Sequence, residues 1–197
     1  MEGSGLHVLT VLGSPRRRGN TATLLDLVEA QVRTLHAVTR VNLPRTSVCG
    51  CLGCNACQRT PDAPGCVQRD PLSEVLDQIL HADLIVYASP VYVWGFTAQM
   101  KALLDRHCCM VKWQDGAKVR ALLAGKPTAL LTTCGGSAEE NADLIEEIFR
   151  REMAYLECRV VGSYAVPHCS SPSELGESAF HAARQMGTRV LAALSVD

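Results

Sequence analysis

Short apolar runs alternate with longer segments of helical spacing along most of the chain. The runs are nearly continuous in apolar residues, which is typical of strands that are buried on both faces. Five strands are expected, at 6–12, 37–43, 83–89, 127–133 and 159–166, and four helices, at 21–36, 97–109, 138–155 and 173–194. Strictly alternating strands and helices predict an α/β fold, in which helices cover both faces of a parallel sheet.

Length and composition narrow the class of protein further. The 197 residues are enough for one full-sized domain, and the net charge of −1 indicates no broad surface for nucleic acid or for an anionic membrane. No apolar run approaches the roughly 20 residues that a membrane span needs. The N-terminal segment lacks a charged stretch followed by an apolar one, so we expect no secretory signal and a cytoplasmic protein.

Cysteine is concentrated in one part of the chain. Of ten cysteines, five fall between Cys49 and Cys66, inside a segment at about 44–70 that is rich in Cys, Gly and Pro and has no periodicity. Irregular segments of that length are uncommon inside compact domains and are usually functional. Clustered thiols in a reducing compartment indicate metal or redox chemistry.

Three further segments follow predicted strands, where ligands bind in parallel α/β sheets. The segment 13–22 (GSPRRRGNTA) opens into a helix, and its backbone N–H groups, hydroxyls and arginine suit a phosphate. An ordinary turn with Asn20 or Thr21 as the helix cap is the alternative.

The other two segments suit a planar ring. The segment 89–97 (SPVYVWGFT) carries two aromatic residues and a glycine, which could form an apolar wall, or could cap a helix and pack into the core. The paired glycines of 132–137 (TTCGGS) allow a ligand to approach the backbone closely, although a plain turn would use them too. All three segments are expected at one edge of the sheet.

Together, the segments GSPRRRGNT, CLGCNAC, SPVYVWGFTAQMKALLDR and TTCGG resemble the flavodoxin-like superfamily, specifically its NADPH-dependent FMN reductase and iron–sulfur flavoprotein branch. The resemblance covers about the first 145 residues. It implies a flavodoxin-like doubly wound sheet of order 2-1-3-4-5, and one FMN-binding domain over 1–197 with a Cys-rich insert at about 44–70. It also implies a homodimer or homotetramer with the flavin near an interface.

The resemblance also assigns residues to the cofactor. The residues it implies around the FMN phosphate are Ser14, Arg16, Asn20, Thr21 and Ala22. Those it implies beside the isoalloxazine ring are Pro90, Val91, Tyr92, Trp94 and Gly95 on one side, and Thr133, Cys134, Gly135 and Gly136 on the other. No residue is recognisable as a dedicated acid or base, so catalytic residues are left unassigned.

The spacing of the clustered cysteines favours an iron–sulfur cluster. Cys51, Cys54 and Cys57 are separated by two residues each, and Cys66 follows after eight more. Four thiolates satisfy a [4Fe–4S] cluster, one for each iron, whereas structural zinc is usually bound by two separated pairs. Cys49 could replace Cys66 as the fourth ligand, and zinc, free thiols or disulfides remain alternatives.

The remaining cysteines are expected to be small buried hydrophobic residues rather than ligands. They are Cys108, Cys109, Cys158 and Cys169, with Cys134 already assigned to the ring.

We therefore expect a flavin-dependent oxidoreductase in which a ferredoxin-like donor passes electrons through a [4Fe–4S] cluster beside the flavin to FMN and a small acceptor. In the alternative, NAD(P)H reduces FMN directly, and the protein is an FMN or quinone reductase without a cluster. A third hypothesis is a redox-sensing or electron-carrying module without a substrate of its own.

Overall fold

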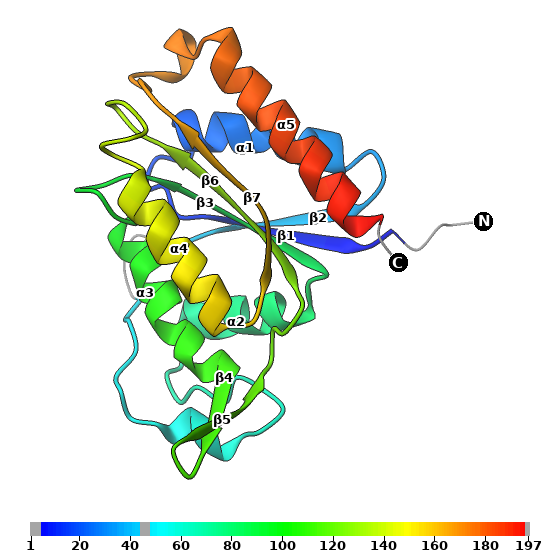
Figure 1. Cartoon of the computed structure of the whole chain (residues 1–197), viewed down its shortest axis with the longest axis vertical. Helices are drawn as coiled ribbons and strands as arrows, with labels where there is room; N and C mark the ends of the chain where they lie inside the picture. The colour runs from blue at the N-terminus through cyan, green and yellow to red at the C-terminus, as the bar shows by residue number, and fades with distance from the viewer. Residues whose placement is uncertain (1–4, 44–47, 196–197) are drawn as a thin grey trace.

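The computed structural model describes residues 5–43 and 48–195, and its centre is a parallel sheet of five strands (Figure 1). The strands are β1 (His7–Leu12), β2 (Ala37–Asn42), β3 (Leu84–Pro90), β6 (Pro127–Thr133) and β7 (Arg159–Val166). Their spatial order is β2-β1-β3-β6-β7, which is 2-1-3-4-5 when only these strands are counted. The predicted sheet order is confirmed.

Helices cover both faces of this sheet, as predicted (Figure 1). Helices α1 (Asn20–Val32) and α5 (Glu177–Leu194) lie on one face, and α2 (Pro71–His81), α3 (Ala98–Arg106) and α4 (Asp143–Tyr155) on the other. Alternate residues of β1 divide between the two cores, because side chains of a strand point to opposite faces. Val8 and Leu12 pack in the α1–α5 core, whereas Leu9 and Val11 pack in the other.

Several helix boundaries differ from the prediction. The expected helices at 138–155 and 173–194 begin later, at Asp143 and Glu177, and the helix expected at 97–109 ends at Arg106. A 3₁₀ turn, η2 (His107–Met110), continues from there. Within the described residues, no helix is long and apolar enough to cross a membrane.

One helix, one β-hairpin and one short 3₁₀ turn were not predicted. Helix α2 begins after Asp70, whose side chain accepts a hydrogen bond from Leu72 N at 3.1 Å. The antiparallel hairpin of β4 (Val111–Gln114) and β5 (Ala117–Ala121) turns at Asp115–Gly116, both with positive φ. Inside the insert lies a 3₁₀ turn, η1 (Ala56–Arg59), while residues 44–47 at its start lie outside the described residues.

Candidate functional site

One pocket lies where β1, β3 and β6 end, and we call it the edge pocket. Its lining residues are Ser14, Arg16, Gly19, Asn20, Thr21, Pro90, Val91, Tyr92, Thr133, Cys134, Gly135, Cys169 and Ser170. The three segments that the sequence analysis singled out after strands therefore meet in one cavity of about 130 Å³.

The first segment presents a helix N-terminus to this pocket. Helix α1 begins at Asn20, and its N-cap, Gly19, has no side chain to accept hydrogen bonds from the first turn. Ser14 Oγ accepts a hydrogen bond from Arg16 N at 3.1 Å, which tightens the turn that precedes the helix. Uncapped N–H groups and the positive end of the helix dipole make such a terminus suitable for an anion.

Two polar side chains of the same helix face the pocket. The Oδ1 atom of Asn20 is buried and has no hydrogen-bond partner. Buried polar groups are nearly always paired, so an unpaired one in a pocket wall fits a ligand that supplies the partner. Thr21 Oγ1 lies 2.7 Å from Thr133 Oγ1, and this hydrogen bond joins the first segment to the one after β6.

The second segment folds into a tight turn beside the pocket. Tyr92 and Gly95 exchange two backbone hydrogen bonds of 2.9 and 3.0 Å, and the two residues between them, Val93 and Trp94, have φ of 48° and 61°. Positive φ strains a β-branched residue such as valine, and such strain concentrates at functional sites. Trp94 Nε1 donates to the carbonyl of Glu140 at 3.0 Å, which holds the turn in place.

Four residues assigned to the cofactor do not line the pocket. Ala22 is buried in the core under α1, and Trp94 and Gly95 form the far side of the turn. Gly136 lies behind the wall, where its carbonyl accepts a hydrogen bond from His168 N at 3.1 Å.

Three lining residues were missed from the sequence, namely Gly19, Cys169 and Ser170. Cys169 and Ser170 lie in the segment after β7, which is a fourth segment at the same sheet edge. The three segments singled out from the sequence follow only the first, third and fourth predicted strands. Cys169 N donates to the carbonyl of Cys134 at 2.9 Å, so the two thiols share one wall. Burial raises the pKa of the Cys169 thiol to about 11 and also raises the pKa of the Cys134 thiol. Both are therefore protonated at neutral pH.

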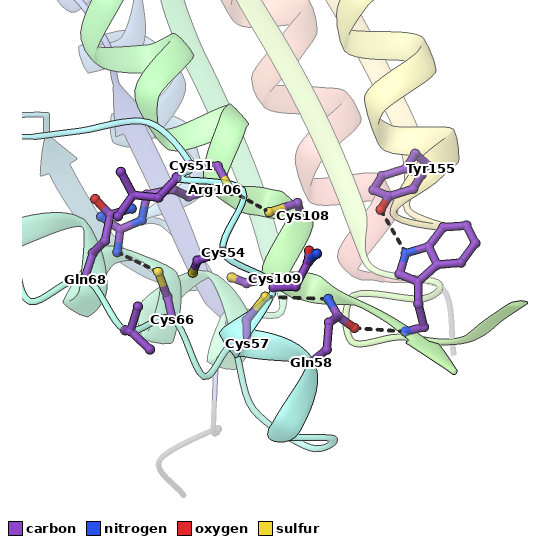
Figure 2. Close-up of a pocket in the computed structure, with 14 residues that line it drawn as sticks. Cys51, Cys54, Cys57, Gln58, Cys66, Gln68, Arg106, Cys108, Cys109 and Tyr155 are labelled. Atoms are coloured by element: carbon purple, nitrogen blue, oxygen red, sulfur yellow. Dashed lines mark hydrogen bonds between the residues drawn. The ribbon is translucent and has the colours of Figure 1, made fainter. Parts of the chain in front are cut away.

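A second pocket, the cysteine pocket, collects six of the ten cysteines (Figure 2). It is lined by Cys51, Leu52, Cys54, Asn55, Cys57, Gln58, Cys66, Val67, Gln68, Arg106, Cys108, Cys109, Trp113 and Tyr155, and has a volume of about 120 Å³. The four cysteines assigned to a cluster are all among them, whereas Cys49 is not.

Two of the six thiols come from outside the insert. Cys108 and Cys109 lie in η2, and the thiol of Cys108 is 3.2 Å from Cys51 Sγ. Cys109 is buried, as predicted, whereas the burial predicted for Cys108, Cys158 and Cys169 was wrong, because all three are only half-buried. Cys108 faces the insert, and Cys169 lines the edge pocket. Burial raises the pKa of the Cys109 thiol to about 12 and raises the pKa of the Cys108 thiol further.

A buried lysine holds the insert through hydrogen bonds to its backbone. Lys112 is 3% exposed, and its ammonium donates to the carbonyls of Cys57, Ala63 and Pro64 at 3.1, 2.8 and 3.2 Å. These contacts use all three N–H bonds of the ammonium. Burial lowers the pKa of Lys112, because a buried ammonium loses its contacts with water. The three carbonyl oxygens take the place of those water contacts.

A buried arginine holds the end of the insert. Arg106 is 1% exposed, and its guanidinium donates to Asp70 Oδ1 at 2.5 Å and contacts Cys66 Sγ at 3.4 Å (Figure 2). Ser73 Oγ lies 3.5 Å from the same nitrogen. This arrangement ties Cys66 and the start of α2 to the last turn of α3.

The donor set of this pocket suits soft metals, because thiolates are the ligands of iron–sulfur clusters and of zinc. Among the described residues, however, no group of three or more His, Cys, Asp or Glu side chains is arranged to hold a metal ion. Cys51 and Cys54 are exposed, whereas Cys57 is buried and Cys66 is half-buried. The outer two thiols of the set are thus open to solvent, and the inner two are covered.

The two pockets have no lining residue in common, and α3 connects them. The helix follows the segment after β3, and its last residue, Arg106, lines the cysteine pocket. Nine residues of α-helix rise about 13 Å. The helix thus runs from Thr97, which is hydrogen-bonded to the segment after β1, to the wall of the cysteine pocket.

Comparison with known proteins places the chain in a family. The sequence model of the NADPH-dependent FMN reductase family matches residues 6–169. An iron–sulfur flavoprotein of Archaeoglobus fulgidus is 28% identical over 187 residues, which are 94% of this chain and 79% of that protein. An iron–sulfur flavoprotein of Methanosarcina thermophila is 33% identical over 103 residues, which are 51% of this chain and 52% of that protein.

Solved structures agree on the fold. An FMN-dependent NADH-azoreductase from Bacillus anthracis, solved in complex with FMN, superposes with a TM-score of 0.69 at 13% identity, over 95% of this chain and 99% of that one. The family match extends over the edge pocket except for Ser170, and over the whole cysteine pocket. The chain thus belongs to the NADPH-dependent FMN reductase family and is a flavin-dependent oxidoreductase.

Proposed function

We propose that this chain passes electrons from a reduced donor through a [4Fe–4S] cluster and FMN to a small-molecule acceptor. The observation that carries the proposal is the convergence of six thiols on one pocket, at the far end of α3 from the edge pocket. When bound, FMN supplies one- and two-electron chemistry, and the protein binds it and sets its surroundings.

The FMN phosphate is assigned to the N-terminus of α1. The uncapped first turn and the hydroxyls of Ser14 and Thr21 support this assignment, as does the unpaired Oδ1 of Asn20, which suits a hydroxyl of the ribityl chain. Arg16 is exposed at the rim, where its charge can neutralise the phosphate without being buried.

The isoalloxazine ring is assigned between the segments after β3 and β6. Pro90, Val91 and Tyr92 would form one wall and Thr133, Cys134 and Gly135 the other. An added Cβ at Gly135 would meet no atom within 4 Å, so there is open space beside this backbone for a ligand. Ala22, Trp94, Gly95 and Gly136 would act by holding these walls in position.

The cluster ligands are assigned as Cys51, Cys54, Cys57 and Cys66. A cubane cluster takes one thiolate for each iron, so it needs four thiols around a cavity rather than three on a single ion. The anchors described above support this assignment, because Lys112 and Arg106 hold the inner half of the insert. The outer half, with Cys51 and Cys54, is exposed and can close over a cluster.

A second candidate is an NAD(P)H-dependent FMN or quinone reductase without a cluster. It is favoured by the finding that no metal-binding group of three side chains is assembled in the described part of the chain. In this case the donor would reach the flavin directly, and the cysteine pocket would hold free thiols.

The chain as a whole is proposed to act as one FMN-binding domain over 1–197 and to assemble as a homodimer or homotetramer. Large apolar side chains on the turn beside the edge pocket support assembly, since Val93 is 88% and Trp94 54% exposed.

Replacing Arg16 tests the phosphate assignment. We expect Arg16→Ala to raise the Kd for FMN about tenfold, because a charge-assisted contact at an exposed rim contributes at the lower end of about 1.5–3 kcal/mol. Quenching of flavin fluorescence on binding measures the Kd. Arg18→Ala, in the same basic run, is the control and should bind FMN normally; the reverse order of the two effects would refute the assignment.

Replacing Lys112 tests the anchor under the insert. Lys112→Met removes a donor from three carbonyls, of which that of Cys57 still accepts from Thr60 N at 3.2 Å. Leaving the carbonyls of Ala63 and Pro64 without that donor costs about 1–3 kcal/mol, so local opening becomes more frequent. We expect alkylation of the buried Cys57 thiol to become about five- to a hundredfold faster. Mass spectrometry of the labelled peptide measures the rate. Lys101→Met, on the exposed surface of α3, should leave the rate unchanged. An unchanged rate in Lys112→Met would show that the lysine does not hold the insert.

A series of cysteine variants tests the cluster. Cys51→Ser, Cys54→Ser, Cys57→Ser and Cys66→Ser should each lose iron while FMN remains bound, because a serine hydroxyl is a harder ligand that ionises less readily. Cys49→Ser is the control and should keep its iron. Iron, acid-labile sulfide and FMN are assayed after anaerobic purification. Wild-type protein without iron would refute the proposed cluster. If Cys49→Ser loses iron and Cys66→Ser keeps it, the fourth ligand is Cys49 and not Cys66.

The electron donor separates the two candidate functions. We expect reduced ferredoxin or a low-potential dye to bleach the flavin faster than NAD(P)H does, with stopped-flow absorbance as the measurement. Rapid bleaching by NADPH alone would favour the reductase without a cluster.

A further inference from the structure

Two cysteines that are far apart in the sequence meet at the mouth of the cysteine pocket (Figure 2). Cys51 belongs to the insert and Cys108 to η2, and their Sγ atoms are 3.2 Å apart although 57 positions separate them. We propose that Cys51 and Cys108 form a reversible disulfide when the cysteine pocket holds no metal centre.

The contact needs little movement to become a bond. A disulfide has an S–S distance of about 2.05 Å, so the two sulfur atoms must approach by about 1.2 Å. Cys51 lies in the exposed part of the insert, where Gly53 N donates to its sulfur at 3.3 Å, while Cys108 is held by η2 at the end of α3. Among the described residues, no second pair of cysteine thiols forms a hydrogen bond with one another. The geometry therefore selects this pair from the six thiols of the pocket.

The chemistry balances with a low-molecular-weight disulfide, such as glutathione disulfide, as the oxidant. The exposed Cys51 loses its proton and attacks one sulfur of the oxidant, whose S–S bond breaks and releases one thiol. Cys108 then loses its proton and attacks Cys51 Sγ, which breaks the mixed disulfide and releases the second thiol. The two cysteines together give up two electrons and two protons, and the oxidant takes up both.

The disulfide would control access of metal to the pocket, a consequence that rests on the proposed function. Cys51 is one of the four assigned cluster ligands, so the bond removes a ligand and ties the insert to the end of α3. The pocket could accept metal again only after reduction. The disulfide and the cluster could thus not be present in the pocket at the same time.

The test uses the full FMN-loaded chain, stripped of metal by a chelator, reduced and kept anaerobic. The protein is treated with glutathione disulfide, its remaining thiols are alkylated, and intact mass should show the loss of two hydrogens. Trypsin should then yield residues 46–59 joined to residues 107–112, and fragmentation should place the bond at Cys51 and Cys108.

Neighbouring cysteines provide matched controls. Cys108→Ser and Cys51→Ser should slow formation of the joined peptides about tenfold or more, because the positioned partner is gone. Cys109→Ala and Cys49→Ser should form them at the wild-type rate. If Cys109→Ala does not fold, Cys49→Ser and the fragment assignment in wild type still decide the pairing.

Two outcomes would overturn the proposal. They are undiminished formation of the joined peptides in Cys108→Ser and a disulfide between Cys54 and Cys57 as the main product. The oxidation is measured on metal-free protein, so it does not depend on the cluster. Wild-type protein purified without iron would therefore refute the proposed cluster but not the proposed disulfide. A wild type that holds iron but does not crosslink when stripped would remove the disulfide alone.

Discussion

All five strands of the main sheet run in one direction, and the edge pocket is a consequence of that constraint. Parallel strands need crossovers over a face of the sheet, so every strand ends at the same edge. The order reverses between β1 and β3, and the crevice opens at such a reversal. Hydrogen bonds then lock the segments together, from Thr97 Oγ1 to the Gly13 carbonyl at 2.7 Å and from Val91 N to the Thr133 carbonyl at 2.8 Å.

Helix α3 is attached at both ends to residues around the two pockets. Its N-cap, Thr97, is fixed to the segment after β1, and its last residue, Arg106, is fixed to Asp70 and Cys66. The element that supports the edge pocket is therefore also a wall of the cysteine pocket. The contacts at its two ends thus join the supports of the two pockets through one helix.

The sequence predicts what local pattern encodes. Strands such as β6 were recognised because their apolar runs are continuous, and the segments after three of them follow from the rule that ligands bind where parallel strands end. Helix α2 and the β4–β5 hairpin had local signals as well, a proline after Asp70 and the Asp115–Gly116 pair, which were not used. The contact between Cys51 and Cys108 has no local signal at all, since it depends on how the insert folds back over α3. Lys112 has the sequence appearance of a surface lysine, and only the insert buries it.

The insert is held by cations because its sequence gives it no apolar face. A loop without a core still buries backbone carbonyls, and each of these needs a donor. Lys112 supplies three donors in one side chain, and Arg106 adds a guanidinium at the other end of the buried half. This half is held in place by side chains of the chain itself. The arrangement that would lower the free-energy cost of binding a cluster also leaves the exposed Cys51 beside Cys108. A pocket that gathers thiols for a metal centre thus also places two of them where an oxidant could join them when no centre is bound.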